Sequence, residues 1–428
     1  MNQLVGDRAT VLAALQNTIT AFRNDGPVVQ SVMNASFPST TEDQRTATRQ
    51  QIINQLQDAY NQALAEPAGE PWYMPQIPVV GLFQTAMEEH LGSDITVSQN
   101  RGAVDTNGVP LPEQFGDSDP LWIEAVVAEM GTLLTGKAPF ISHSHLSDFF
   151  YNIEDNCTIA LVADWGADNP GANNVAQQMQ NRNPDYAIHL GDIYYAGEAP
   201  EAKGFLYRFR NIASKRSFAL NGNHEMYSGG KSYFNLVLLN LQQSASYFGL
   251  FNQNWQFLGL DTAYVDHVLT SPSDSRLQNQ FDWAVDKLKN AARSSVVLTH
   301  HQPFSAYQPE HDDGARLRQD IGNLDLAIQP VSIFAWFFGH EHRCTIYDDS
   351  FNDFRARLIG NGCIPHLPQA PPTIAPPVPY KAINSTARPD GYAICGFVLL
   401  TLTGPDMKVE YINEDGSLFA TENWTAKT

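Results

Sequence analysis

The chain has 428 residues, of which 43% are hydrophobic and 17% are charged. A chain of this length and composition can bury at least one large hydrophobic core, so we expect a globular protein. It carries 26 basic and 46 acidic residues, which gives a formal net charge of -20. This charge repels polyanions and argues against coating nucleic acid or binding an acidic membrane surface, whereas a metal ion or a small substrate suits it.

No part of the chain approaches the roughly 18 to 20 consecutive apolar residues that span a bilayer. The start, MNQLVGDRAT, lacks the basic and apolar regions of a signal peptide. We therefore expect a soluble protein, located in the cytoplasm unless the sequence is the mature form of a secreted one. The four cysteines, Cys157, Cys344, Cys363 and Cys395, show no CxxC spacing. We interpret them as mostly buried thiols and not as a disulfide framework or a zinc ribbon.

Residues 1–150 are predicted to form a mostly helical N-terminal cap region. Apolar residues recur at helical spacing in Thr10–Phe22 and Thr41–Ala65, and Pro120–Leu134 begins with a Ser-Asp-Pro start signal. Gly102–Gly116 has the composition of an irregular loop. Nothing in this region resembles a known family, so the sequence assigns it no role beyond its helices.

Residues 151–428 are predicted to form a single α/β domain. Helical patterns such as Asn174–Gln180 and Leu277–Ala291 alternate with short apolar runs rich in β-forming residues. The predicted strands are Thr158–Ala163, Tyr186–Leu190, Ser217–Leu220, Trp255–Leu260, Ser295–Thr299, Ile333–Phe338 and Arg357–Ile359. This alternation predicts layered sheets and helices, with functional residues gathered at the carboxyl ends of the strands.

The C-terminal part departs from this alternation. Pro365–Pro379 is rich in proline and is predicted to be a surface loop. Tyr392–Thr403 and Met407–Ile412 are predicted to form a terminal hairpin of two or three strands.

Side chains that can bind metal ions follow five of the predicted strands. They are Asp164, Asp192, Asn223 with His224, His300 with His301, and His340 with His342. One such residue would mean little, because Asp and Asn are common in turns. Together, carboxylate and amide oxygens mixed with imidazoles suit two adjacent metal ions of the kind used in phosphoryl transfer.

The order and spelling of these segments resemble the calcineurin-like metallophosphoesterase superfamily over residues 157–365. Its five sequence blocks correspond to DWG at 164–166, GDIYY at 191–195, GNHE at 222–225, THH at 299–301 and GHEH at 339–342. Most branches have a histidine two residues after the first aspartate, where this chain has Gly166. Tyr195, three residues after Asp192, matches instead the G-D-x-x-Y spelling of purple acid phosphatases. The chain therefore resembles that branch.

The resemblance implies a four-layer αββα metallophosphoesterase sandwich, with residues 151–428 as the catalytic domain and a dinuclear metal centre at the carboxyl edges of its sheets. It implies one ion held by Asp164, Asp192, Tyr195 and His342, and a second held by Asp192, Asn223, His300 and His340. Asp192 would bridge the two ions. Because a phenolate favours a trivalent ion, the expected pair is iron(III) with divalent iron, zinc or manganese.

Two histidines are expected to act in catalysis, His224 and His301. His224 resembles the residue that protonates the leaving oxygen, and Glu225 would orient it. The doubled histidine leaves an alternative open. Alignment on the pair makes His300 the metal ligand and places His301 on the substrate side, whereas H-x-P spacing to Pro303 makes His301 the ligand; we prefer His300.

The chain is therefore predicted to be a hydrolase that cleaves small phosphate monoesters by in-line attack of a metal-bound hydroxide. A phosphodiesterase that uses the same centre is the alternative. An interaction scaffold on the same fold is a third interpretation, which we disfavour because every metal position is kept or replaced. The sequence does not indicate an oligomeric state.

Overall fold

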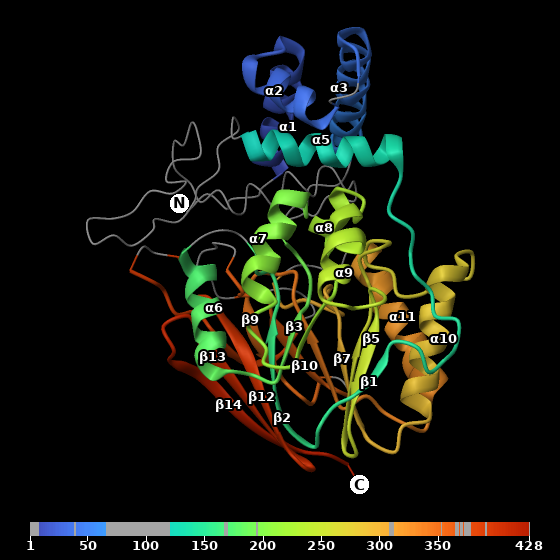
Figure 1. The fold of residues 1–428 in the computed structure, drawn as a ribbon, viewed down its shortest axis with the longest axis vertical. Helices are drawn as coiled ribbons and strands as arrows, with labels where there is room; N and C mark the ends of the chain where they lie inside the picture. The colour runs from blue at the N-terminus through green and yellow to red at the C-terminus, as the bar shows by residue number, and fades with distance from the viewer. Residues whose placement is uncertain are drawn as a thin grey trace. The chain divides into compact units, whose positions relative to one another are not determined.

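The computed structural model describes residues 8–37, 40–65, 120–166, 170–193, 196–307, 312–351, 353–363, 368, 371, 378–389 and 392–427. The chain divides into two compact units (Figure 1). One comprises Met1–Lys137 with Tyr227–Gly229, and the other comprises Ala138–Met226 with Gly230–Thr428. The predicted loop at Gly102–Gly116 and most of Pro365–Pro379 lie outside the described residues.

The first unit is helical where it is described. Its helices are α1 (Arg8–Asn24), α2 (Pro27–Ser36), α3 (Glu42–Ala65) and α5 (Pro120–Thr135). Leu15, Ile19 and Phe22 of α1 and Ile52 and Leu56 of α3 are fully buried, and their spacing of three or four residues places each set on one helix face. The three predicted helices are confirmed. The short α2, which starts with proline at its first helical position, was not predicted.

The second unit is built on two mixed β-sheets. The eight-stranded sheet has the order β1 (Phe150–Asn152), β5 (Phe248–Phe251), β6 (Trp255–Gly259), β7 (Ser294–Leu298), β8 (Ala335–Phe338), β10 (Arg355–Ile359), β9 (Cys344–Tyr347) and β11 (Tyr380–Ile383). The six-stranded sheet has the order β14 (Leu418–Thr425), β13 (Asp406–Asn413), β12 (Gly396–Thr403), β2 (Asn156–Val162), β3 (Tyr186–His189) and β4 (Arg216–Ala219). All seven predicted strands are confirmed, and the predicted hairpin has three strands.

Helices flank these sheets. They are α6 (Pro170–Arg182), α7 (Ala199–Phe209), α8 (Asn223–Tyr227), the π-helix η1 (Tyr233–Val237), α9 (Leu238–Asn240), α10 (Ser275–Lys289) and α11 (Asp312–Ile328). Among the helices that the structure describes in either unit, none combines the length and the apolar character that a membrane crossing requires.

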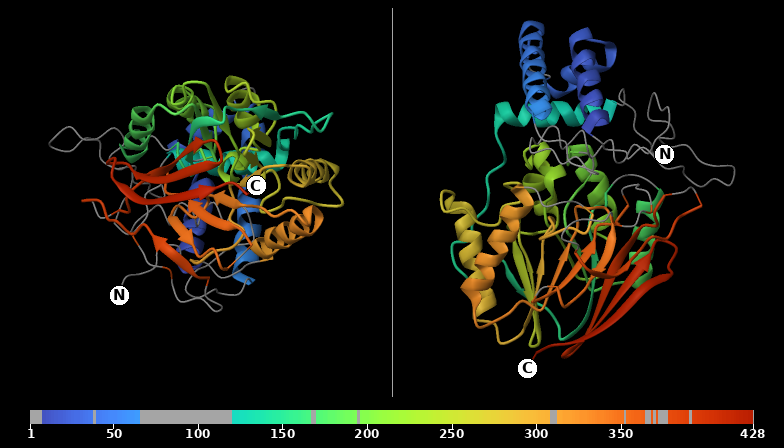
Figure 2. Two further views of the ribbon diagram at one scale, coloured as in Figure 1. Left: turned by 90° about the horizontal axis from the view of Figure 1, so that it is seen from below. Right: turned by 180° about the vertical axis from the view of Figure 1, so that it is seen from behind.

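Alternation of buried side chains along the strands creates the layers. In β2, Ile159 and Leu161 belong to the core that also contains Val296 of β7, from the other sheet. The intervening Ala160 belongs instead to the core that contains Met179 of α6. Because neighbouring residues of a strand point to opposite faces, one face of each sheet packs on the other sheet and the opposite face packs on helices. The predicted αββα arrangement is therefore confirmed (Figure 2).

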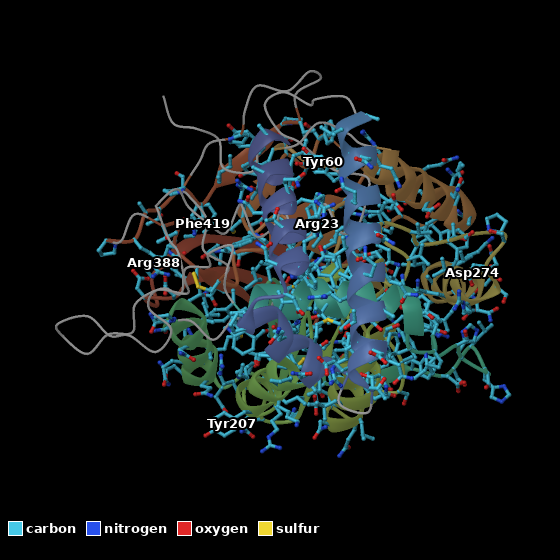
Figure 3. All side chains as sticks on the ribbon, turned by 90° about the horizontal axis from the view of Figure 1, so that it is seen from above. Arg23, Tyr60, Tyr207, Asp274, Arg388 and Phe419 are labelled. Atoms are coloured by element: carbon cyan, nitrogen blue, oxygen red, sulfur yellow. A yellow bond between two sulfur atoms is a disulfide. The ribbon has the colours of Figure 1, made fainter. Side chains whose placement is uncertain are left out.

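The cysteines depart in part from the expectation of buried thiols. Cys157 and Cys344 are free and buried, as expected. Cys363 and Cys395, which are 32 residues apart, form a disulfide, and Figure 3 shows it near Arg388. The expectation was wrong for this pair because the end of β10 and the start of β12 meet, with the Gly396 amide donating to the Asn361 carbonyl at 2.8 Å. Strands from two different sheets meet here, which spacing along the chain does not reveal.

A buried arginine connects the two sheets. Arg357 of β10 has 0% relative exposure, and its Nε and Nη2 donate to both carboxylate oxygens of Glu422 in β14, at 2.8 and 2.6 Å. Asp349 accepts from Nη2 at 2.9 Å, and the Tyr411 hydroxyl donates to Glu422 at 2.8 Å. A paired buried charge of this kind becomes costly once its partner is removed.

We expect Glu422→Gln to lower the free energy of unfolding by about 3 kcal/mol, because Arg357 then keeps its charge with one carboxylate fewer. Chemical denaturation of the full chain measures this change. Glu410→Gln is the matched control, since Glu410 in β13 pairs with the half-exposed Lys408, and we expect it to cost less than about 1 kcal/mol. Equal effects of the two substitutions would contradict the role of the Arg357 pair.

Candidate functional site

The predicted metal ligands that the structure describes follow parallel strands. In the six-stranded sheet β2, β3 and β4 are parallel neighbours, and in the eight-stranded sheet β7 is parallel to β8. Asp164 follows β2, Asp192 follows β3, Asn223 follows β4, His300 follows β7, and His340 and His342 follow β8. The carboxyl ends of parallel strands meet at one edge of a sheet, so the site forms where these edges of the two sheets come together.

Four donor atoms surround one point, and they belong to the residues predicted for the second ion. His300 Nε2 lies 3.0 Å from Asn223 Oδ1 and 3.2 Å from His340 Nδ1. It lies 3.3 Å from Asp192 Oδ2, and His340 Nδ1 lies 3.0 Å from Asn223 Oδ1. Ligands about 2.0 to 2.1 Å from a tetrahedral ion are about 3.3 Å apart. The spacing of these atoms therefore fits a metal ion.

A second group of donors contains the residues predicted for the first ion. Ligand atoms of Asp164, Asp192 and His342 all lie within 4.8 Å of one another, and His342 Nε2 is 3.6 Å from Asp164 Oδ1. Asp192 belongs to this group and also to the group with His300 and His340, which is the sharing predicted for a bridging carboxylate. Tyr195 lies outside the described residues.

Several of these ligands have an unusual backbone conformation. Asp164, Asp192, His340 and His342 have φ angles of 56°, 70°, 75° and 50°. Residues other than glycine rarely adopt this left-handed backbone conformation, and those that do are concentrated at functional sites. The sharp turn after each strand directs the side chain back toward the neighbouring strand ends.

Asp192 and His300 stabilise each other's charged forms. Burial alone would raise the pKa of the Asp192 carboxyl, but His300 and His224 lower this pKa well below its usual range. Burial would likewise lower the pKa of His300, but the charge of Asp192 raises it to about 9. A buried carboxylate among imidazoles is thus held in its anionic form, which is the form that binds metal.

Glu225 supports the site through the backbone. Its carboxylate accepts hydrogen bonds from the amides of Asp192, Ile193 and Gly222. Burial, and next the charge of Asp192, raise the pKa of Glu225 to about 8. We expected Glu225 to orient His224. The bonds described above fix the turns that carry Asp192 and Asn223, and the orientation of His224 by Glu225 stays a prediction.

The two predicted catalytic histidines occupy different places. His224 is buried, its amide donates to Asp192 Oδ1 at 3.1 Å, and its Nε2 lies 3.8 Å from Asp192 Oδ2. His301 has other partners: its Nδ1 lies 3.1 Å from Thr262 Oγ1 and its Nε2 lies 2.9 Å from Asp266 Oδ1.

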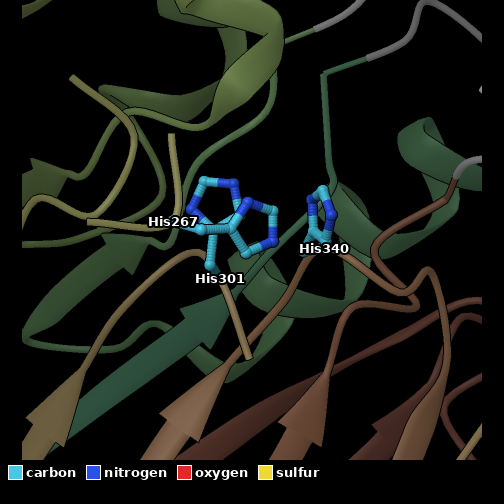
Figure 4. Close-up of side chains that lie close together, drawn as sticks. All are labelled: His267, His301 and His340. Atoms are coloured by element: carbon cyan, nitrogen blue, oxygen red, sulfur yellow. The ribbon is translucent and has the colours of Figure 1, made fainter. Parts of the chain in front are cut away.

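His267 joins His301 and His340 in a third cluster, which sequence analysis missed (Figure 4). A usable signal was present, because Asp266 and His267 follow the correctly predicted strand at Trp255–Leu260. The signal was weak because His267 lies eight residues after Gly259, the last residue of β6. The predicted ligands that the structure describes all lie within four residues of the ends of their strands.

Residues 157–344 match the family described as calcineurin-like phosphoesterase. Structures with a similar chain path include GAP50, the anchor in the inner membrane complex of Plasmodium, at 15% identity and a TM-score of 0.48, covering 64% of this chain and 90% of that chain. A purple acid phosphatase from yellow lupin (Lupinus luteus) seeds is 16% identical, with a TM-score of 0.43, covering 63% of this chain and 54% of that chain. Among curated proteins, none matches this chain significantly in sequence.

We expect Glu225→Gln to weaken zinc binding by about 10- to 100-fold. The glutamine side chain has one acceptor oxygen where glutamate has two, so it cannot accept all the backbone hydrogen bonds that fix the turn at Asp192. Zinc titration of the metal-depleted full chain measures this change. Glu154→Gln serves as the control, since Glu154 pairs with Lys215 and its side chain is 52% exposed. Unchanged zinc affinity in Glu225→Gln would show that these backbone bonds do not support the site.

Proposed function

Because residues 157–344 belong to the calcineurin-like phosphoesterase family, we propose that the chain is a metal-dependent phosphatase that hydrolyses small phosphate monoesters. One observation carries the proposal: Asp192 is common to two groups of side chains that could bind metal ions. A shared carboxylate between two adjacent groups is the arrangement that a dinuclear centre requires.

The ligands follow from the two groups. We propose that Asp164, Asp192, Tyr195 and His342 hold one ion, and that Asp192, Asn223, His300 and His340 hold the other. When bound, such a pair of ions polarises phosphoryl oxygens and lowers the pKa of a water molecule. The donor spacing of 3.0 to 3.3 Å around His300 supports the second set.

His224 is proposed as the proton donor to the leaving oxygen. Its side chain is only 3% exposed, and its Nε2 lies 3.8 Å from the bridging carboxylate of Asp192. A substrate phosphate bound across both ions would therefore lie within reach of this imidazole. A positioned acid contributes about 10²- to 10⁴-fold to the rate.

His301 is proposed to lie on the substrate side of the centre and not to bind the ion held by His300. Its ring nitrogens are directed to Thr262 and Asp266. Its ring centroid is 4.8 Å from that of His300. This geometry supports the alignment in which His300 is the ligand.

The first ion is proposed to be iron(III), on the basis of Tyr195 in the GDIYY segment. We expect concentrated, oxidised protein to show a broad visible band from tyrosinate-to-iron charge transfer, and we expect Tyr195→Phe to lose it. Absorption spectroscopy combined with metal analysis checks this. Fully active protein that contains zinc or manganese in both positions and no iron would refute the purple acid phosphatase assignment, though not the phosphoesterase one.

We expect kcat/KM to be higher for 4-nitrophenyl phosphate than for bis(4-nitrophenyl) phosphate. A dianionic monoester gains more from a trivalent and divalent pair than a singly charged diester does. Turnover of both substrates by the metal-loaded chain measures this. A clear preference for the diester would make the protein a phosphodiesterase, and no turnover of either substrate with both ions bound would favour the scaffold interpretation.

A further inference from the structure

A cluster of histidines lies beside the proposed dinuclear centre, and His340 is the member that the two share. His267 follows β6, His301 follows β7 and His340 follows β8, and these strands are consecutive parallel neighbours in the eight-stranded sheet. The three imidazoles each offer a nitrogen within 4.8 Å of the others. Figure 4 shows the three rings gathered together from three separate loops.

Asp266 adds a carboxylate to this cluster. Its Oδ1 lies 2.9 Å from His301 Nε2 and 3.4 Å from His267 Nδ1. Both ring nitrogens are buried, and the Asp266 carboxylate is the polar group that approaches each of them. One carboxylate oxygen therefore lies close to two imidazole nitrogens, and a metal ion can replace the protons between groups of this kind.

The backbone positions this group. His267 has a φ of 54° and thus shares the left-handed conformation of the proposed ligands. Asp261 fixes the start of the loop, because its carboxylate accepts from the amides of Ala263 and Tyr264 at 2.9 and 2.8 Å. Thr262 Oγ1 lies 3.1 Å from the other nitrogen of His301, as the outer partner of a metal-binding histidine does.

We propose that His267, His301 and Asp266 form a further metal site, which binds a divalent transition-metal ion of the zinc class next to the dinuclear centre. Two imidazoles and a carboxylate are a donor set that suits zinc. The separations of 2.9 and 3.4 Å are close to the roughly 3.3 Å expected between ligands of a tetrahedral ion. Because His340 belongs both to this cluster and to the group with Asp192 and His300, the ion adjoins the second position of the centre.

The charge of Asp266 distinguishes a metal ion from a phosphate in this position. A carboxylate 2.9 Å from His301 Nε2 attracts a cation and repels an anion. The Asp266 side chain is also 48% exposed, so the site has a route for an ion to enter from solvent.

Metal counting on the full chain tests this proposal. We expect zinc-loaded His267→Ala, after removal of free zinc, to contain one zinc ion fewer than the wild type. Inductively coupled plasma mass spectrometry measures the zinc content. Asp266→Asn is the second variant, since its exposed side chain tolerates replacement, and we expect its affinity for the same ion to fall about tenfold or more. His145→Ala is the matched control, because it removes an exposed imidazole outside the cluster, and it should retain the wild-type zinc content.

The outcomes separate this inference from the proposed function. Equal zinc content in His267→Ala and the wild type overturns the further site, and if inorganic phosphate also binds more weakly to His267→Ala, the cluster is an anion site instead. Asp192→Asn alters a ligand of the dinuclear centre and none of the further site, so this variant should retain the ion that depends on His267. If Asp192→Asn contains as much zinc as the wild type while His267→Ala loses one ion, the dinuclear centre fails and the further site stands.

Discussion

The buried negative charge of Asp192 is the constraint on which the rest of this structure depends. A carboxylate with no solvent exposure is costly unless positive charge or hydrogen bonds compensate it. Here His300 and His224 provide part of that compensation, and the backbone amide of His224 donates to it. Metal ions on both sides would complete the compensation, which explains why so many donors converge on one residue.

The fold serves this convergence by bringing together strand ends from two sheets. A single parallel sheet could place Asp164, Asp192 and Asn223 along one edge, but the histidines come from the second sheet. The apolar core between the sheets fixes the separation of the two edges. Arg357 and Glu422 add a charged connection between the sheets. The distances within the site are therefore set by packing far from it.

Much of this organisation could be predicted from the sequence, because each central strand is an apolar run and a polar residue that can bind metal follows it. Apolar runs marked the central strands, and the polar residue after each run marked the site. The strands β1, β5, β9 and β11, each of three or four residues, were not predicted. The pairing of Cys363 with Cys395 was missed because it depends on which strands lie side by side.

The cluster around His267 could not be recognised from the chain for a related reason. A histidine inside a long loop has no periodic pattern around it, and nothing in the sequence places Asp266 against His301. Only the parallel order of β6, β7 and β8 brings these side chains together. Residues directly after strands were predictable, and residues positioned by loop conformation were not.

The central claim is that Asp192 is shared by two metal ions. A crystal structure of the metal-loaded protein, with anomalous scattering data at the iron and zinc absorption edges, tests it most directly. The account predicts two anomalous peaks, one on either side of the Asp192 carboxylate and about 3.5 to 4 Å apart. Fully active, metal-loaded protein with one peak or none beside Asp192 would contradict it.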